Sequence, residues 1–207
     1  MIRVAAEGAV TTITLDRPDK ANALTEAMLR DLLAAIQAAH DAAAVILTGI
    51  GKVFSAGADL DAARAGLATS PLWEQVSGAI ADVPGLTIAA LNGTVAGGAT
   101  GMVLACDLRI AVPSAKFFYP VMKLGYLPQP SDPGRMTALI GPSRTKLILL
   151  AGQKIDAAQA LGFGLVDELV APDDLLARAD ALCADIRQAP VDTARAIKAL
   201  CSGAADG

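Results

Sequence analysis

Two glycine-rich turns stand out among the residues that could do chemistry. FSAGADL (54–60) and NGTVAGGATGMVLACD (92–107) each place small residues between a predicted strand and a predicted helix. The first N–H groups of a helix have no carbonyl partner, and they point outward with the positive end of the helix dipole. Glycine and alanine leave this backbone open to a substrate. One such turn would be a weak indication, but two predict a paired N–H site with the geometry of an oxyanion hole.

Few other side chains suggest nucleophilic or metal chemistry. Ser55 has no partner that would make it a nucleophile, and the single histidine, His40, falls at the predicted end of a helix, where it would stabilise the helix dipole. The cysteines are odd in number and widely spaced, with no C-x-x-C pair: Cys106, Cys183 and Cys201. The sequence therefore predicts a reduced, cytoplasmic chain without a metal site.

Composition and charge exclude several classes of partner. The 207 residues carry a formal net charge of −4, and Lys and Arg form only scattered pairs. Nucleic acid, including RNA, and an anionic membrane are therefore not expected as partners. The N-terminal residues alternate like a strand and lack the long apolar core of a signal peptide, and no apolar run is long enough to span a bilayer.

The elements that must position the two turns alternate between strands and helices. Apolar runs predict strands at 9–15, 45–48, 87–91 and 108–111. Apolar residues at helical spacing, with Thr25 as a first cap, predict helices at 26–39, 72–82, 97–106, 134–151, 156–161, 173–189 and 191–200. This alternation is typical of an α/β fold with a mainly parallel sheet, to which the last third of the chain adds helices.

Five segments, in this order, resemble the crotonase (enoyl-CoA hydratase/isomerase) superfamily: LDRPDKANAL (15–24), VILTGIGKVFSAGADL (45–60), LNGTVAGGATGMVLACDLRIA (91–111), AKFFYPVMKLGYLP (115–128) and AGQKIDAAQALGFGLVDELV (151–170). The resemblance implies an α/β spiral of ββα units in a single domain over residues 1–207. It further implies a spiral core at 1–140 and a helical trimerisation region at 141–207, which would assemble a homotrimer or a dimer of trimers.

The resemblance also implies a substrate class and a set of site residues. Members of the superfamily bind acyl-CoA thioesters and stabilise the enolate beside the thioester carbonyl with two backbone N–H groups, which here belong to Ala58 and Gly98. Coenzyme A then enters as part of the substrate and not as a permanent cofactor. The family's coenzyme A contacts correspond to Lys20, Ala21, Ala23, Ala56, Asp59 and Leu60. Lys20 can also be read as a solvated surface lysine and Asp59 as a helix cap.

The chain departs from the family at the acid–base positions. A hydratase of this superfamily uses two glutamates to activate water, and the corresponding positions here are Gly101 and Val121, neither of which can carry a proton. Some relatives place an aspartate directly after the LP pair, where this chain has Gln129. Glutamine can hydrogen-bond a substrate but cannot act as a general base near neutral pH. Asp132 is the best remaining carboxylate, unless it serves only as a cap or turn residue before the next helix.

Two tyrosines flank the same region. Tyr119 and Tyr126 would either place hydroxyl groups in an otherwise apolar pocket or serve as half-buried packing residues. The leading functional hypothesis is an acyl-CoA-binding protein of the enoyl-CoA hydratase/isomerase class that stabilises an enolate without two-glutamate hydration. The alternative is a non-catalytic acyl-CoA binder or assembly subunit.

Overall fold

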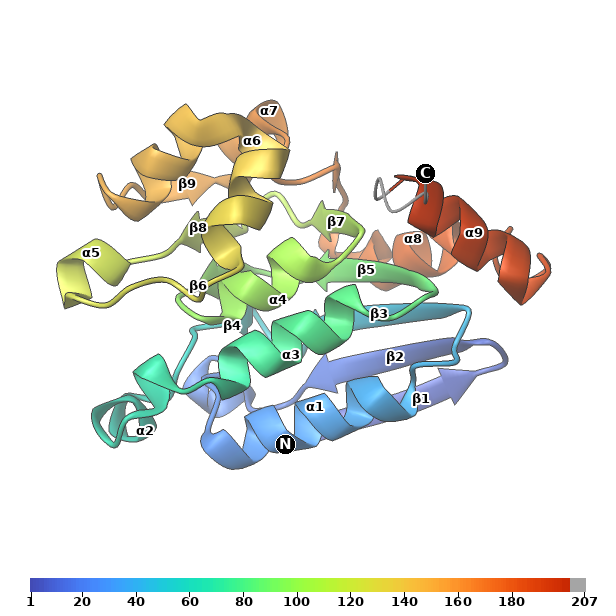
Figure 1. Ribbon diagram of the computed structural model, residues 1–207, viewed down its shortest axis with the longest axis horizontal. Helices are drawn as coiled ribbons and strands as arrows, with labels where there is room; N and C mark the ends of the chain where they lie inside the picture. Colours follow the sequence, from blue (N-terminus) through green and yellow to red (C-terminus); the bar gives the residue numbers. More distant parts are fainter. Residues whose placement is uncertain (202–207) are drawn as a thin grey trace.

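The computed structural model describes residues 1–201 and shows two β-sheets wrapped by helices (Figure 1). The larger sheet has the strand order β1-β2-β3-β5-β7-β10, and the smaller has the order β4-β6-β8-β9. The strands of the larger sheet are β1 (Ile2–Glu7), β2 (Val10–Leu15), β3 (Ala44–Gly49), β5 (Leu86–Leu91), β7 (Leu108–Ala111) and β10 (Glu168–Leu169). Those of the smaller sheet are β4 (Val53–Ser55), β6 (Thr94–Ala96), β8 (Lys116–Phe118) and β9 (Ile155–Asp156).

Helices follow most of the strand pairs. They are α1 (Glu26–Ala38), α2 (Leu60–Arg64), α3 (Leu72–Ala81), α4 (Ala99–Ala105), α5 (Val121–Leu124), α6 (Asp132–Leu149), α7 (Ala157–Phe163), α8 (Leu175–Leu182) and α9 (Val191–Cys201). The 3-10 turns are η1 (Pro18–Lys20), η2 (Leu67–Thr69) and η3 (Pro172–Asp174). Thr25 caps α1 by accepting a hydrogen bond from the Met28 N–H, as its position in the sequence predicts.

The chain repeats one unit three times, and this repetition makes the spiral. A strand of the larger sheet (β3, β5 or β7) is followed by a strand of the smaller sheet (β4, β6 or β8) and then by helix. Within each sheet the successive strands pair in parallel. The arrangement confirms the expected ββα spiral of an α/β fold, with helices α6 to α9 in the last third. It also brings the ends of β4 and β6 side by side.

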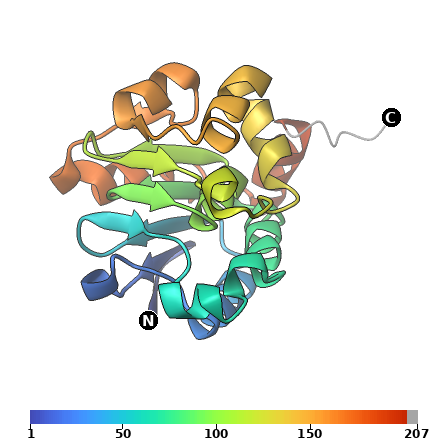
Figure 2. The same cartoon turned by 90° about the vertical axis from the view of Figure 1, so that its left-hand side faces the viewer.

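Small and aliphatic side chains fill the core between the sheets and helices. Ile88, Ala89, Ala90 and Leu91 of β5 are fully buried, because this central strand is covered on both faces. Helix α3 packs against α1 and α4, and α8 packs against β5 and β7. Helices α2 and α5 project together at one end of the molecule, the end that faces the viewer in Figure 2.

Several boundaries differ from the sequence-based expectation. The predicted helix at 134–151 begins at Asp132 and is broken at Gly141, whose φ of 79° and following Pro142 interrupt the helical geometry. The helix expected at 97–106 starts at Ala99. The helix expected at 173–189 is regular only over Leu175–Leu182. The strands of the smaller sheet were not predicted as strands, since the longest of them has three residues.

Candidate active site

The two glycine-rich turns touch each other, as the pairing of β4 with β6 requires. Gly57 has a φ of 88° and Gly97 a φ of 57°, values that favour glycine. A Cβ at Gly57 would lie 2.8 Å from the carbonyl oxygen of Ala96, so only a glycine allows the two backbones to approach this closely. The turns therefore form one continuous strip of exposed backbone.

The N–H groups of Ala58 and Gly98 donate to no acceptor among residues 1–201, while those of Asp59 and Gly97 are paired. The Asp59 N–H donates to the Leu24 carbonyl at 2.8 Å, and the Gly97 N–H donates to the Phe118 carbonyl at 3.2 Å. Ala58 and Gly98 both line the same cavity of about 280 Å³. Two residues with unpaired N–H groups thus line one cavity, and an oxyanion hole formed by them stays a prediction.

The cavity is mostly apolar and lies between the two turns, α2 and the segment around α5. Its walls include Ala56, Ala58, Leu60, Ala63, Arg64, Ala68, Trp73, Ala96, Gly97, Gly98, Phe118, Tyr119, Pro120, Val121, Leu124, Tyr126, Leu127 and Gln129. The indole of Trp73 is held in place by a hydrogen bond from its Nε1–H to the Leu67 carbonyl at 2.8 Å. An apolar wall strengthens any hydrogen bond made inside the cavity.

The predicted coenzyme A contacts divide into two groups. Ala56 and Leu60 line the cavity, whereas Lys20, Ala21, Ala23 and Asp59 do not. The latter group lies on or against the segment 17–24, which pairs with the first turn. The Ala56 N–H donates to the Ala21 carbonyl at 3.0 Å, and the Leu24 N–H donates to the Gly57 carbonyl at 2.8 Å. Lys20 is exposed, as expected for a surface lysine or for a group at the mouth of a site.

Asp59 has a clear structural role. Its carboxylate accepts hydrogen bonds from the N–H groups of Asp61 and Ala62 at the start of α2, and it forms an ion pair with Arg17 at 2.8 Å. The hydrogen bond from Arg17 is the main reason why the pKa of Asp59 lies below its usual range. The helix-cap interpretation is therefore confirmed, and a coenzyme A contact by Asp59 stays a prediction.

Asp132 occupies the space that a side chain at position 101 would need. A Cβ at Gly101 would lie 2.7 Å from Asp132 Oδ1, 3.1 Å from Oδ2 and 3.2 Å from Cγ. Asp132 is the first residue of α6, yet its carboxylate makes no capping hydrogen bond to that helix. The cap interpretation of Asp132 is therefore wrong. The carboxylate instead turns toward α4, the helix that carries Gly101.

Tyr119 connects this buried carboxylate to the cavity. Its hydroxyl donates to Asp132 Oδ2 at 2.9 Å and accepts from the Gln129 N–H at 3.3 Å. Tyr119 lines the cavity whereas Asp132, which is 0 % exposed, does not. Tyr126 and Gln129 also line the cavity, Tyr126 as an exposed residue and Gln129 as a buried one.

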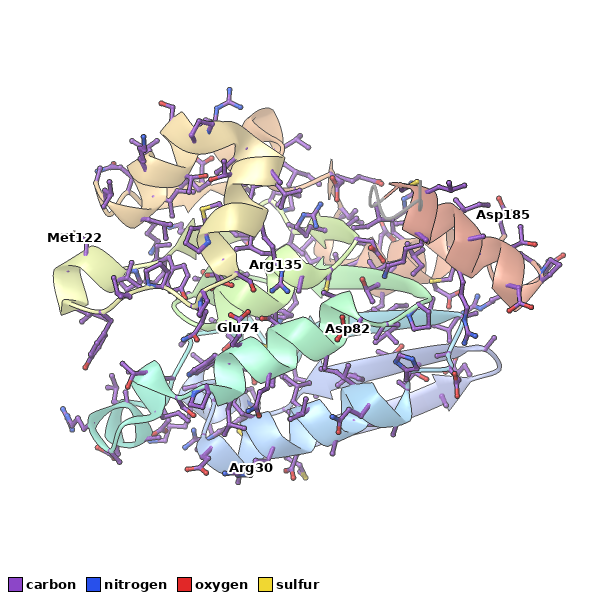
Figure 3. All side chains as sticks on the ribbon, in the orientation of Figure 1. Arg30, Glu74, Asp82, Met122, Arg135 and Asp185 are labelled. Carbon is purple, nitrogen blue, oxygen red and sulfur yellow. The ribbon has the colours of Figure 1, made fainter. Side chains whose placement is uncertain are left out.

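The surroundings of Asp132 favour its protonated form. Burial raises the pKa of Asp132 to about 6, and the negative charge of Glu74 acts in the same direction, while the Tyr119 hydrogen bond and the Arg135 charge oppose it. Figure 3 labels Glu74 on α3 and Arg135 on α6, and α4, which carries Gly101, packs against both of these helices. Glu74 also accepts hydrogen bonds from the N–H and the hydroxyl of Ser131. Burial and the adjacent Asp132 likewise raise the pKa of Tyr119.

Comparison with known proteins identifies the family. The pattern that defines the enoyl-CoA hydratase/isomerase family matches residues 5–206. The chain belongs to this family. It is 36% identical over 204 residues to the Mycobacterium tuberculosis protein named "Probable enoyl-CoA hydratase echA8", covering 95% of this chain and 79% of that one.

Two solved structures have the same fold as this chain. The enoyl-CoA hydratase from Bacillus anthracis superposes with a TM-score of 0.90 at 32% identity, covering 100% of this chain and 84% of that one. DspI from Pseudomonas aeruginosa superposes with a TM-score of 0.89 at 33% identity, covering 98% of this chain and 86% of that one. Within residues 1–201 of this family member, no helix has the length and hydropathy needed to cross a membrane.

Sequence reasoning missed two residues that shape the site, Trp73 and Asn22, and the structural role of a third, Ser55. Trp73 forms a wall of the cavity, and its single occurrence in the sequence is the only signal that it carries. Asn22, with a φ of 52°, anchors the segment 17–24, and its place within LDRPDKANAL could have marked it. Ser55 is not a nucleophile: its hydroxyl donates to the Asn22 carbonyl at 2.8 Å and accepts from the Gly57 N–H at 3.1 Å, which fixes the first turn.

Proposed function

We propose that this chain binds an acyl-CoA thioester and stabilises its enolate, with the thioester oxygen held by the N–H groups of Ala58 and Gly98. The observation that carries the proposal is that these two N–H groups have no acceptor within residues 1–201 and belong to residues that line one cavity. The N–H groups at the start of a helix have no carbonyl partner and carry the positive end of its dipole, so two unpaired N–H groups on neighbouring turns suit an oxygen from outside the chain. Each such donor contributes about 10²–10³ in rate in enzymes with an oxyanion hole.

The proposal extends to the rest of the substrate and to the assembly. The acyl and thioester end would lie in the apolar cavity, and the remainder of coenzyme A would run over the segment 17–24 past the exposed Lys20. A homotrimer or a dimer of trimers, formed in the cytoplasm through the helical region 141–207, would cover apolar side chains that the monomer exposes there. These are Leu147, Leu150, Leu161, Leu176, Ile197 and Leu200.

Acetoacetyl-CoA tests the oxyanion hole without needing a protein base. Its acidic α-carbon exchanges protons with solvent, and its enolate absorbs in the ultraviolet, so a working hole lowers the pH at which the bound thioester forms the enolate. We expect this shift for the wild-type chain and a smaller shift for Ala58→Pro, which removes one N–H donor. Circular dichroism would show whether that variant is folded. Saturable binding without an enolate shift in the wild type would overturn the oxyanion-hole proposal.

A second function, non-catalytic binding of an acyl-CoA, is favoured by one specific observation. The two positions that correspond to the hydratase glutamates hold Gly101 and Val121, and Val121 lines the cavity with an apolar side chain. A binder would shift the acetoacetyl-CoA equilibrium but consume no thioester. Hydration of crotonyl-CoA, which removes its conjugated absorbance, would exclude the pure binder, whereas no turnover would exclude simple hydration alone and leave isomerisation of a thioester as the measurement that separates the two functions.

A further inference from the structure

We propose that Tyr119 and Asp132 form a proton relay that replaces the missing acid–base residues, with Tyr119 touching the substrate and Asp132 acting through it. This inference rests on the proposed function, because it needs a thioester in the cavity. It assigns a chemical role to a tyrosine that sequence reasoning could also read as a packing residue. The relay would move the proton at the α-carbon of the bound acyl group.

The place of the Asp132 carboxylate is the first observation. Its Oδ1 lies 2.7 Å from the point where a Cβ at position 101 would stand, so this carboxylate and a longer side chain at 101 exclude each other. Asp132 of α6 therefore fills the space beside position 101 of α4 with a carboxylate, and glycine at 101 makes room for it.

The unsatisfied state of this carboxylate is the second observation. Asp132 Oδ1 is buried and has no hydrogen-bond partner within residues 1–201, while Oδ2 has a single partner, the Tyr119 hydroxyl. A buried polar group without a hydrogen-bond partner destabilises the folded state, and a charged group does so more strongly. A purely structural role would be better served by a neutral side chain. A carboxylate that must take up a proton, by contrast, needs an oxygen lone pair that no hydrogen bond occupies.

The position of Tyr119 is the third observation. A phenol oxygen has one proton to donate and two lone pairs to accept with. The proton goes to Asp132 and one lone pair takes the Gln129 N–H, so one lone pair of the hydroxyl of this cavity-lining residue remains. Ala58 and Gly98 line the same cavity. The thioester oxygen can therefore lie against Ala58 and Gly98 while the α-proton faces Tyr119 in the same cavity.

The proton balance of the step requires both residues. The α-proton moves to Tyr119 Oη as the Tyr119 proton moves to Asp132 Oδ2, and the C–H electron pair enters the enolate. The negative charge passes from Asp132 to the thioester oxygen, which Ala58 and Gly98 hold. The reverse transfer delivers the proton back to carbon, and no further reactant is needed. Because burial and Asp132 disfavour a free tyrosinate, the two transfers occur together.

But-3-enoyl-CoA tests the relay, since removal of its α-proton and return to the γ-carbon yields the conjugated isomer, which is followed by absorbance. We expect turnover by the wild type and a loss of about 100-fold or more in Tyr119→Phe and in Asp132→Asn. Asp82→Asn, at an exposed position at the end of α3, makes the same chemical change away from the cavity and should leave the rate within a factor of two.

The pH profile separates a relay from a structural role. The ionised Asp132 accepts the proton, so the wild-type rate should rise with pH through about pH 6. The charged and titratable groups that face Asp132 are Tyr119, Glu74 and Arg135. Asp132→Asn should remove this rise from the residual activity, whereas a variant that is merely less stable would keep it.

The outcomes distinguish the relay from the proposed function. An acetoacetyl-CoA enolate shift with no isomerisation by the wild type would overturn the relay and leave the oxyanion hole standing. Isomerisation that survives in folded Tyr119→Phe would also overturn it. If neither thioester binds, the proposed function itself fails. Should Asp132→Asn not fold, Tyr119→Phe, which removes a single hydroxyl, still decides the question.

Discussion

The indole of Trp73 lies directly against the backbone of Gly98. A Cβ at residue 98 would stand 2.8 Å from Cδ2 and 2.9 Å from Cε3 of this ring. The φ of Gly98 is −58°, which any residue adopts, so the close approach of the indole and not the backbone conformation requires glycine here. The same contact places an aromatic wall beside one of the two unpaired N–H groups.

Gly98→Ala should weaken both stability and the oxyanion hole. The added methyl must displace Trp73 or shift the second turn, which costs about 1–3 kcal/mol in a packed interior. Because the N–H of residue 98 moves with the turn, the acetoacetyl-CoA enolate shift should fall as well. Urea unfolding and the ultraviolet titration measure the two effects.

Gly134→Ala is the matched control for that substitution. Gly134 lies in α6, and a Cβ there would meet no atom within 4 Å. Alanine in a helix is more favourable than glycine by about 1 kcal/mol, so this variant should be as stable as the wild type or slightly more stable. If Gly98→Ala behaved like Gly134→Ala in both measurements, the indole contact would not constrain the site.

Gly101→Ala should destabilise the wild-type protein and stabilise a variant that lacks the Asp132 carboxylate. In the wild type the new methyl overlaps the Asp132 carboxylate, and the cost of about 1–3 kcal/mol exceeds the helix-propensity gain of about 1 kcal/mol. In the Asp132→Ala background the overlap is gone, and Gly101→Ala should stabilise by about 1 kcal/mol. Urea unfolding of the four chains gives the interaction energy. Equal effects in both backgrounds would show that the two positions do not compete for space.

Asp132 should make the protein less stable as the pH rises from about 4 to about 6. The pKa of this carboxyl is about 6 in the folded protein against a reference of 3.8, so in this window the folded state holds a proton that the unfolded state has released. Stability therefore falls with rising pH, by about 3 kcal/mol in total, and levels off above the folded pKa.

The difference between the wild type and Asp132→Asn isolates this effect. Urea unfolding of both chains between pH 4 and pH 8 measures it. Asp59 and Asp180 have lowered pKa values, so their contribution to the stability of the protein is lost as the pH falls. This contribution is the same in both proteins and cancels from the difference between them. A difference that does not change with pH would mean that Asp132 titrates normally.

The sequence predicted the elements whose signals are local. The strand at 45–48 is a continuous apolar run and the helix at 26–39 has a capping threonine, and both stand as β3 and α1. The break at Gly141 was missed, although the Gly-Pro pair there is a known helix-ending signal. The strands β4, β6 and β8 are too short to show alternation of apolar and polar residues. Their pairing into a sheet depends on the tertiary fold and could not be predicted from local sequence.

The site was predictable in its backbone and not in its side-chain contacts. Small residues at strand–helix junctions predicted the two turns, and residues of both turns line the cavity. The contact of Trp73 with Gly98 and the approach of Asp132 to Gly101 join residues 25 or more positions apart, and they depend on how α3, α4 and α6 pack. No spacing in the sequence encodes such a distance.

Asn22→Ala should destabilise the fold and weaken acyl-CoA binding, whereas Asn92→Ala should affect mainly stability. The Asn22 amide accepts from the Arg17 N–H at 2.8 Å and donates to the carbonyls of Ile50 at 2.9 Å and Val53 at 2.8 Å. Its loss leaves these groups without their partner, which costs about 2–4 kcal/mol at roughly 1 kcal/mol per hydrogen bond. The segment 17–24, with its proposed coenzyme A contacts, then loses the side-chain hydrogen bond to Val53 of β4 and keeps the Ser55 hydrogen bond to the backbone of residue 22.

Asn92 is a close match because its amide also makes three hydrogen bonds, accepting from the Gly49 N–H and donating to the carbonyls of Gly51 and Val53. None of these partners lies in the segment 17–24, so the loop keeps its shape when Asn92 is removed. Calorimetric titration with acetoacetyl-CoA should show a weaker affinity for Asn22→Ala and an unchanged one for Asn92→Ala. Equal affinities in both variants would mean that the segment 17–24 does not contribute to acyl-CoA binding, since its anchoring would then be irrelevant to the ligand.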